Sequence, residues 1–95
     1  MQHAIFSVFD EKAHAYVIPF CFVNTQVAKR AFRNSINDKN HMFGQNPYDF
    51  TLFKIATFED TTGELRPTKL SLGNGVEYIE HELEDTQQQL QLTKE

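Results

Sequence analysis

The chain has 95 residues, a single cysteine and a net charge of −4, and 40% of its residues are hydrophobic. This size predicts one domain with one core, and a lone cysteine excludes an internal disulfide framework. The longest apolar run is far short of a membrane span and the N-terminus lacks the features of a secretion signal, so we expect a soluble protein of a reducing cytosol.

The acidic excess is confined to the end of the chain. Residues 1–76 hold eight lysines and arginines against seven acids, whereas residues 77–95 hold six acids against one lysine. A near-neutral body can carry a local basic face that binds phosphates, which a uniformly acidic protein would repel. The net charge therefore does not exclude a nucleic-acid partner.

Two apolar runs near the N-terminus predict an antiparallel hairpin. They are residues 4–9 (AIFSVF) and residues 15–23 (AYVIPFCFV), both rich in β-branched and aromatic side chains. Pro19 lacks an N–H and therefore indicates an edge strand or a bulge. Strict alternation would place four side chains on one face of the second strand: Tyr16, Ile18, Phe20 and Phe22. We expect Cys21, within this apolar run, to be a small buried hydrophobe rather than a nucleophile.

Residues 25–37 (TQVAKRAFRNSIN) have a clear helical period. One side of this helix is apolar and consists of Val27, Ala28, Ala31, Phe32, Ser35 and Ile36. The other side carries Lys29, Arg30 and Arg33 among amides and contains no acid. Asn24 or Thr25 can cap the start. Such a helix buries one side against a sheet, and its basic side either faces solvent or meets a negatively charged partner.

The second half of the sheet follows a loop at residues 39–49. Residues 50–58 (FTLFKIATF) predict a third strand, which is apolar on both faces and therefore central. Alternation would put five side chains on one of its faces: Phe50, Leu52, Lys54, Ala56 and Phe58. A turn around Gly63 leads to a weaker fourth strand at residues 65–72.

The end of the domain is predicted from glycines and from a change of composition. Residues 73–75 (GNG) indicate a tight turn, and residues 76–79 a short fifth strand. From residue 80 the chain is rich in Glu and Gln. Ile79, just before this segment, and three side chains within it have heptad-like spacing: Leu83, Thr86 and Leu90. We expect residues 80–95 to be a disordered tail or a short helix.

These elements predict an α+β protein with a single antiparallel sheet of four to five strands in ββαββ order. One amphipathic helix covers one face of the sheet, and an acidic Gln-rich C-terminal tail follows. We expect one domain at residues 1–79 and the tail at residues 80–95.

The motifs of common catalytic and metal sites are missing from the sequence. His3, His14, His41 and His81 lie in separate segments without metal-ligand spacing. The chain has no glycine-rich phosphate loop and no nucleophile elbow. We therefore expect no enzyme activity, no metal and no cofactor.

The residue types that bind single-stranded nucleic acid are present. Such binding needs a cationic track and aromatic side chains on which bases stack. The candidate cations are Lys29, Arg30 and Arg33 of the helix, Lys12 of the hairpin turn and Lys54 of the third strand. The candidate rings are Phe6, Phe9, Tyr16, Phe20, Phe22, Phe53 and Phe58, of which we expect two or three at most to be exposed. An exposed aromatic face could equally form a homodimer or a higher homo-oligomer.

The succession of these segments resembles a phage family over residues 5–72. The matching features are Phe6–Asp10, Pro19-Phe20, the helix with Ala28, Arg30 and Phe32 that ends in Asn37-Asp38, Pro47 to Phe53, Phe58 with Asp60, and Gly63. They resemble the small nonstructural protein of gokushovirus-type microviruses, which are phages with single-stranded circular DNA genomes. In this chain Asn46-Pro47-Tyr48 stands where the family pattern has His-Pro-Glu.

The resemblance implies an early protein of the infected bacterial cytoplasm. The nonstructural protein of these phages is regarded as the counterpart of the coliphage protein that diverts replication from duplex DNA to single-strand synthesis and packaging. It implies DNA binding, no catalytic residues, and Arg30 as a contact candidate. The Gln-rich tail is not part of the family pattern.

Two functions therefore compete. The first is a non-enzymatic DNA-binding protein, preferring single strands, that acts in genome replication and packaging. The second is a protein–protein adaptor that contacts the viral replication initiator or the procapsid and binds little DNA directly. For the acidic tail we expect competition with DNA for the basic helix face.

Overall fold

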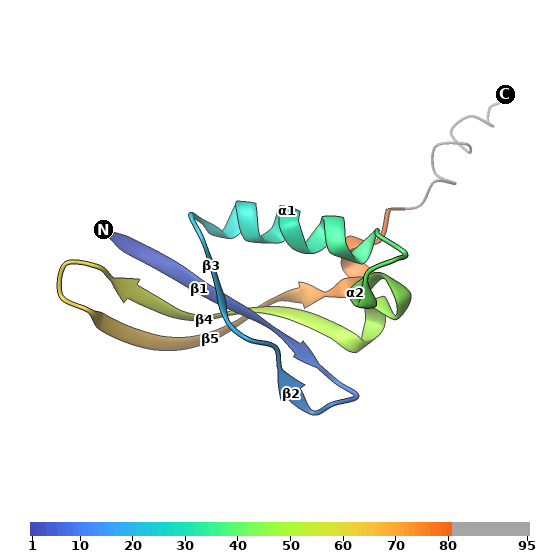
Figure 1. Ribbon diagram of the computed structural model, residues 1–95, viewed down its shortest axis with the longest axis horizontal. Helices are drawn as coiled ribbons and strands as arrows, with labels where there is room; N and C mark the ends of the chain where they lie inside the picture. Colours follow the sequence, from blue (N-terminus) through green and yellow to red (C-terminus); the bar gives the residue numbers. More distant parts are fainter. Residues whose placement is uncertain (81–95) are drawn as a thin grey trace, which may run out of the picture.

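The computed structural model describes residues 1–80 and has one antiparallel sheet with a main helix laid across one face (Figure 1). This confirms the predicted α+β class with a single antiparallel sheet and one main helix. The prediction for the tail lies outside the described residues. The elements in chain order are β1 (Gln2–Asp10), β2 (Ala15–Tyr16), β3 (Phe20–Phe22), α1 (Thr25–Ile36), α2 (Met42–Gln45), η1 (Pro47–Asp49), β4 (Phe50–Glu59), β5 (Glu64–Asn74) and η2 (Gly75–Tyr78).

The strands lie in the order β2-β1-β4-β5, and β3 also pairs with β1. All of these pairings are antiparallel. The predicted N-terminal hairpin is thus confirmed, and so is the central position of β4. Pro19 lies in the break between β2 and β3, at the edge of the sheet, as its missing N–H predicts.

The core lies between α1 and the face of the sheet that α1 covers. Ala28, Phe32 and Ile36, spaced four residues apart, are the buried side chains of α1. They form one cluster with five residues of the sheet and η2: Phe6, Val8, Phe50, Leu52 and Tyr78. Asn24 caps the helix, because its side chain accepts a hydrogen bond from the Val27 N–H at 2.9 Å. The predicted apolar side of the helix is therefore confirmed.

The segment after β5 differs from the prediction. A tight turn at residues 73–75 and a fifth strand at 76–79 are wrong, because β5 continues to Asn74 and Gly75–Tyr78 form the 3-10 helix η2. Asn74 and Glu77 close a capping box at its start. A Cβ atom on Gly75 would collide with the carbonyl oxygen of Pro47, so this glycine allows η1 and η2 to pack closely. The expected loop at 39–49 also contains the short helices α2 and η1.

Two irregularities overturn the predicted alternation of side chains. Phe20 pairs with Phe6 and packs on the core, but Tyr16 pairs with Phe9 and lies on the opposite face. The reason is the break at residues 17–19, which resets the alternation between β2 and β3. Cys21 follows Phe20 and faces away from the core, so its side chain is exposed and the predicted burial is wrong.

The second irregularity is a bulge in β4. Lys54 pairs with Phe6 and Ala56 pairs with Ile5, so Ile55 is the extra residue. The bulge moves Ala56, and Phe58 beyond it, to the face that α1 does not cover. The predicted common face for residues 50, 52, 54, 56 and 58 is therefore wrong beyond Lys54.

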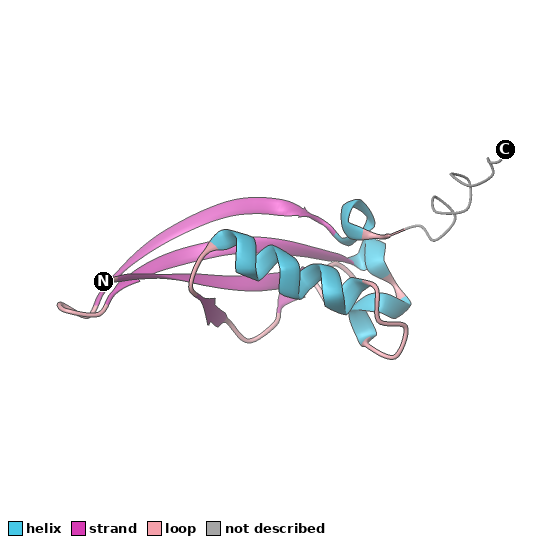
Figure 2. Ribbon diagram, turned by 90° about the horizontal axis from the view of Figure 1, so that it is seen from above, coloured by secondary structure: helices cyan, strands magenta, loops and turns pink. Residues whose placement is uncertain are grey.

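The sheet extends beyond the helix. Figure 2 shows a curved sheet, and in both ribbon views the β4–β5 turn projects past the first turn of α1 (Figures 1 and 2). Residues 61–70 are accordingly all exposed.

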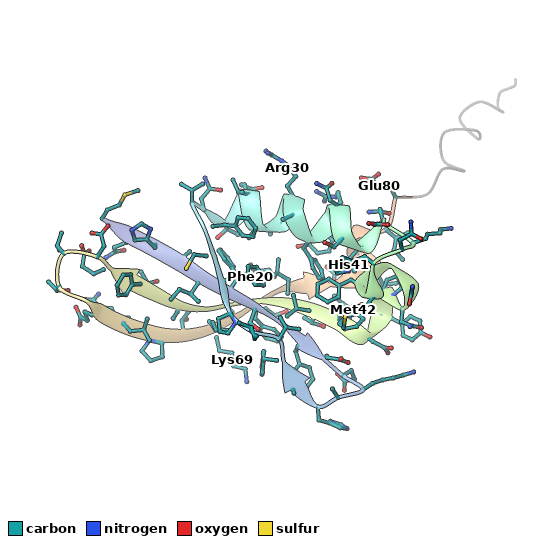
Figure 3. All side chains as sticks on the ribbon, in the orientation of Figure 1. Phe20, Arg30, His41, Met42, Lys69 and Glu80 are labelled. Carbon is teal, nitrogen blue, oxygen red and sulfur yellow. The ribbon has the colours of Figure 1, made fainter. Side chains whose placement is uncertain are left out.

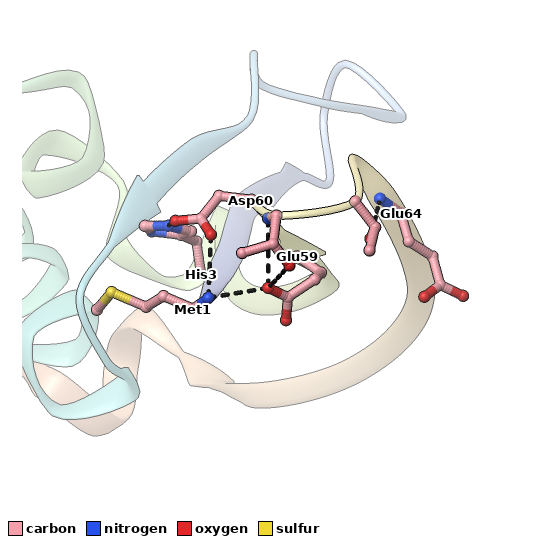
Figure 4. A network of polar contacts seen from close by, with 7 residues as sticks. Met1, His3, Glu59, Asp60 and Glu64 are labelled. Atoms are coloured by element: carbon pink, nitrogen blue, oxygen red, sulfur yellow. Dashed lines mark hydrogen bonds and ion pairs between the residues drawn. The ribbon is translucent and has the colours of Figure 1, made fainter.

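A polar network fixes the projecting end to β1 (Figure 4). The amine of Met1 donates hydrogen bonds to Glu59 Oε2 at 2.8 Å and to Asp60 Oδ1 at 3.0 Å, and His3 Nε2 lies 2.8 Å from Asp60 Oδ2. The hydrogen bond from His3, followed by that from the amine, lowers the pKa of Asp60. The hydrogen bond from the amine, followed by those from Thr61, lowers the pKa of Glu59.

Candidate nucleic-acid interface

Three aromatic rings gather on the open face, which is the face of the sheet that α1 does not cover. The rings of Phe9 and Tyr16 have centroids 4.9 Å apart, and those of Tyr16 and Phe53 are 5.6 Å apart in an edge-to-face arrangement. Tyr16 is 40% exposed, and Phe9 and Phe53 are half-buried. Each ring therefore contacts a neighbour while part of its surface meets solvent.

A lysine completes this group. Lys69 of β5 places its Nζ 5.3 Å from the ring centroid of Tyr16 and 6.0 Å from that of Phe53. Both distances are typical of cation–π contacts. We call Phe9, Tyr16, Phe53 and Lys69 the open-face cluster.

The register of the sheet produces this cluster from three segments. Phe9 pairs with Tyr16 across β1 and β2, while Phe53 pairs with Ser71, two residues from Lys69 on the same face of β5. The short strand β2 is held in place by Ser7, whose hydroxyl donates to the Val17 carbonyl oxygen at 2.8 Å. This bond satisfies a serine that is fully buried on the open face.

The predicted helix cations lie on the other side of the protein. Arg30 and Arg33 are exposed and Lys29 is half-buried on the outer side of α1. None of the ion pairs found within residues 1–80 involves these three side chains. We call Lys29, Arg30 and Arg33 the helix cations.

Arg33 has a structural contact as well. Its guanidinium carbon lies 5.2 Å from the centroid of the Tyr78 ring, and the Tyr78 hydroxyl donates to the Leu72 carbonyl oxygen at 2.6 Å. Burial raises the pKa of Tyr78, although the positive charge of Arg33 acts in the opposite direction.

The two remaining predicted cations lie apart from this group. Lys54 is half-buried on the α1 side of β4, where it pairs with Phe6. Lys12 lies in the turn between β1 and β2, with its Nζ 3.8 Å from Asp49 Oδ2. Figure 1 shows this turn at the bottom of the view and α1 at the top. That these five cations contact nucleic acid stays a prediction.

The sequence predicts that helix cations contact phosphates and that exposed rings on the uncovered face stack bases, and the protein has these two groups on opposite faces. Figure 3 shows Arg30 above the sheet and Lys69 below it. The helix cations can contact phosphates but have no neighbouring exposed ring cluster in the described part of the chain. The open-face cluster combines rings with a cation, which is the combination that single strands need.

Sequence reasoning did not include Lys69 among the candidate cations and could not select which rings are exposed. Of the seven candidates, Phe6 is fully buried and Phe20 and Phe22 pack on the core. Phe58 lies on the open face but outside the cluster, with its ring tilted against that of His3 at a centroid distance of 6.2 Å. The signal for Lys69 is weak because the pairing of β4 with β5 is irregular at two places, which hides the face of each β5 residue.

Other kinds of site find no support among residues 1–80. No three His, Cys, Asp or Glu side chains are placed to share a metal ion in this part of the chain. None of its helices has the length and apolar character to cross a membrane.

Comparison with known proteins identifies one family. Its model, described as Phage ORF5 protein, matches residues 3–78, which extend from β1 to η2. The match supports the sequence resemblance at the level of a phage protein family. Curated proteins and solved structures gave no match.

Proposed function

The chain belongs to the Phage ORF5 protein family, and we propose that it binds single-stranded DNA, without enzymatic activity, during phage genome replication and packaging. The site of action is the cytoplasm of the host bacterium. The sequence resemblance to the nonstructural protein of gokushovirus-type microviruses supports this choice, because those phages package single-stranded DNA.

The open-face cluster is the observation that carries this proposal. The Tyr16 ring lies 4.9 Å from that of Phe9 and 5.6 Å from that of Phe53, and the solvent-exposed parts of these rings provide surfaces on which one or two unpaired bases can stack. Stacking on an aromatic side chain contributes about 1–3 kcal/mol per base. The bases of a duplex are already stacked on each other and cannot reach these rings, so the cluster favours single strands.

Lys69 supplies a positive charge beside the rings, where the phosphate of a stacked nucleotide would lie. Its Nζ lies over two of the rings, so a phosphate next to a stacked base comes within reach of the ammonium group. The helix cations are a second, separate surface for phosphates. They read only the backbone, which single strands and duplexes share, and therefore add affinity without strand preference.

The test is fluorescence anisotropy of a labelled oligo-dT with the full chain at two salt concentrations, beside a duplex of equal length. We expect tighter binding to the single strand and weaker binding at the higher salt. Equal affinity for both DNAs would contradict the role of the rings, and no binding at low salt would contradict the function.

DNA binding by the variant Lys69→Gln tests whether the open-face cluster is the binding site, and the variant Lys39→Gln is the matched control. Both lysines are exposed, but Lys39 lies in the segment between α1 and α2, away from the rings. We expect K69Q to lower affinity and to reduce the salt dependence by about 0.7 in the logarithmic slope, the value for one phosphate contact. If K39Q has the larger effect, the cluster is not the site.

A protein–protein adaptor is the second candidate function. The observation that favours it is the apolar character of the open face beyond the cluster, where Phe58 pairs with Leu65 and Ile5 with Ala56. Leu65 is 55% exposed. Ile5 and Phe58 are half-buried and Ala56 is buried, so the exposed apolar surface here centres on Leu65, and apolar side chains exposed in this way are found at protein interfaces.

Capture of the viral replication initiator or procapsid protein distinguishes this function from DNA binding. A complex that survives nuclease treatment and is abolished in Leu65→Asp would support the adaptor. A complex that disappears with nuclease would show that DNA bridges the two proteins and would remove this candidate.

A further inference from the structure

The outer side of α1 is a cationic surface without an acidic partner in the described part of the chain. Lys29, Arg30 and Arg33 follow the axis of a helix that has no acid in its first turn. The acids that come after α1 and before Glu80 form no ion pair with these three cations. Asp38 accepts a hydrogen bond from the Asn40 N–H, and Glu77 accepts one from the Asn74 N–H.

The chain leaves the described region at one end of this surface. The Glu80 N–H donates to Asn37 Oδ1 at 2.8 Å, and Asn37 is the C-cap of α1. The Asn37 side chain also donates to the Arg33 and Tyr78 carbonyl oxygens, at 2.8 and 2.9 Å. Residue 80 is thus fixed to the carboxyl end of α1, and Figure 3 shows Glu80 and Arg30 on the same side of the molecule.

The following fifteen residues, 81–95, are long enough to return along the helix. They hold four acids and one lysine. At up to about 3.5 Å per residue they reach roughly 50 Å, whereas the twelve residues of α1 span about 18 Å.

The spacing of the charges also fits. Measured along the helix axis from Asn37, the three cations lie at about 6 Å (Arg33), 10 Å (Arg30) and 12 Å (Lys29). The first three acids beyond Glu80 are Glu82, Glu84 and Asp85. They can reach up to about 7, 14 and 17 Å from Glu80, which covers the positions of all three cations.

The balance of charges favours contact over repulsion. The carboxyl end of a helix carries about half a negative charge, which opposes acids nearby. The three side chains carry three full positive charges on the same surface. Exposed pairs contribute little singly, but a tether at the helix end replaces free association with a high local concentration.

We propose that residues 81–95 dock on the helix cations of the same chain, with Glu82, Glu84 and Asp85 opposite Arg33, Arg30 and Lys29. The docked segment occupies the surface that phosphates would use and leaves the open-face cluster uncovered. The contact itself does not rest on the proposed function, since it joins two parts of one protein. Its consequence is that a polyanion must displace the segment before it binds α1.

Zero-length carbodiimide cross-linking of the full chain, read by mass spectrometry, tests the contact without DNA. We expect Lys29 to be joined to Glu82, Glu84 or Asp85 within one chain, with a yield that is independent of protein concentration. The yield should fall several-fold in 1 M salt, where the screening length shortens to about 3 Å. Substitution of Glu82→Gln, Glu84→Gln and Asp85→Asn together should abolish these cross-links.

The matched control keeps the charge and changes other side chains of the segment. Gln87→Ala, Gln88→Ala and Gln89→Ala together should leave the Lys29 cross-links unchanged. Cross-links of the tail acids to Lys12, which lies far from α1, measure the background. A Lys29 yield no higher than that background, or one that rises with protein concentration, would overturn docking within one chain.

Discussion

The two faces of the sheet carry the same kinds of side chain but differ in what covers them. Phe6 and Phe50 point toward α1 and are 0% and 5% exposed, whereas Phe9 and Phe53 point away from it and are half-buried. On the covered face the rings meet Phe32 and Tyr78 from outside the sheet. On the open face, within residues 1–80, the rings meet Tyr16 and, for Phe53, Lys69.

The difference indicates which rings serve stability and which remain available to a ligand. Full burial of a phenylalanine contributes about 1.5–3 kcal/mol to folding, so the covered rings belong to the core. The rings on the open face keep part of their apolar surface in contact with water, and a ligand that covers this surface would gain the corresponding free energy. Variants on the two faces should therefore separate stability from binding.

The largest effect is expected from the covered face. Phe32→Ala removes a side chain that is 4% exposed and contacts the rings of Phe43 and Tyr78. We expect a loss of about 3–5 kcal/mol in the free energy of unfolding, measured by urea denaturation. The fraction that stays folded should bind oligo-dT as the wild type does. Unchanged stability would show that α1 does not seal the core.

The next effect concerns binding rather than stability. Tyr16→Ala removes the central ring of the open-face cluster and should weaken oligo-dT binding by about 1–3 kcal/mol. Tyr48→Ala is the matched control, because Tyr48 is 63% exposed and lies in η1, outside the cluster. Anisotropy titrations with oligo-dT measure the affinity of both variants. A loss as large for Y48A as for Y16A would assign binding to another surface.

A smaller effect is expected from the helix cations. Changing Lys29, Arg30 and Arg33 together to Ala should reduce the salt dependence of binding by about 0.7 for each phosphate that the variant no longer neutralises. Single-strand and duplex affinities should fall by similar factors, because these side chains contact only phosphates. A loss restricted to single strands would contradict the separation of the two faces, and an unchanged slope would remove α1 from the interface.

The smallest effect is a pH dependence of the covered face. The folded pKa of Tyr78 is raised above its ordinary value of 10.0 by burial, so the folded state favours the neutral phenol. Its stabilisation is therefore complete below pH 10 and is lost as the pH rises further. Tyr78→Phe removes the hydrogen bond to the Leu72 carbonyl oxygen, so we expect its free energy of unfolding to be about 0.5–1.5 kcal/mol lower at neutral pH. The variant should also show a smaller loss of stability at alkaline pH. Urea denaturation between about pH 8 and pH 11 is the measurement, and parallel curves would contradict the assignment.

The regular parts of the fold could be predicted because each depends on local periodicity. The apolar side of α1 follows from a period of about 3.6 residues, and the central position of β4 from its two apolar faces. A cap at Asn24 or Thr25, and an edge strand or a bulge at Pro19, follow from the chemistry of single residues, and the structure selects Asn24 and the edge. These features place the covered face correctly.

The open face could not be predicted because it depends on irregularities. The extra residue Ile55 and the break at residues 17–19 each change which face the following side chains occupy, and neither has a sequence signal of sufficient strength. Strict alternation therefore assigns Tyr16 and Phe58 to the wrong face, and the apolar run around Cys21 gives no sign that this side chain is exposed. Lys69 joins two rings through long-range pairing, which one sequence does not reveal.

The central claim is that a single strand binds the open face of the sheet. NMR titration of the full chain with oligo-dT, followed through the aromatic side-chain resonances, tests it most directly. We predict that the rings of Phe9, Tyr16 and Phe53 shift strongly, while those of Phe6, Phe32 and Phe50 stay unchanged. Shifts confined to α1, with the three open-face rings unaffected, would contradict it.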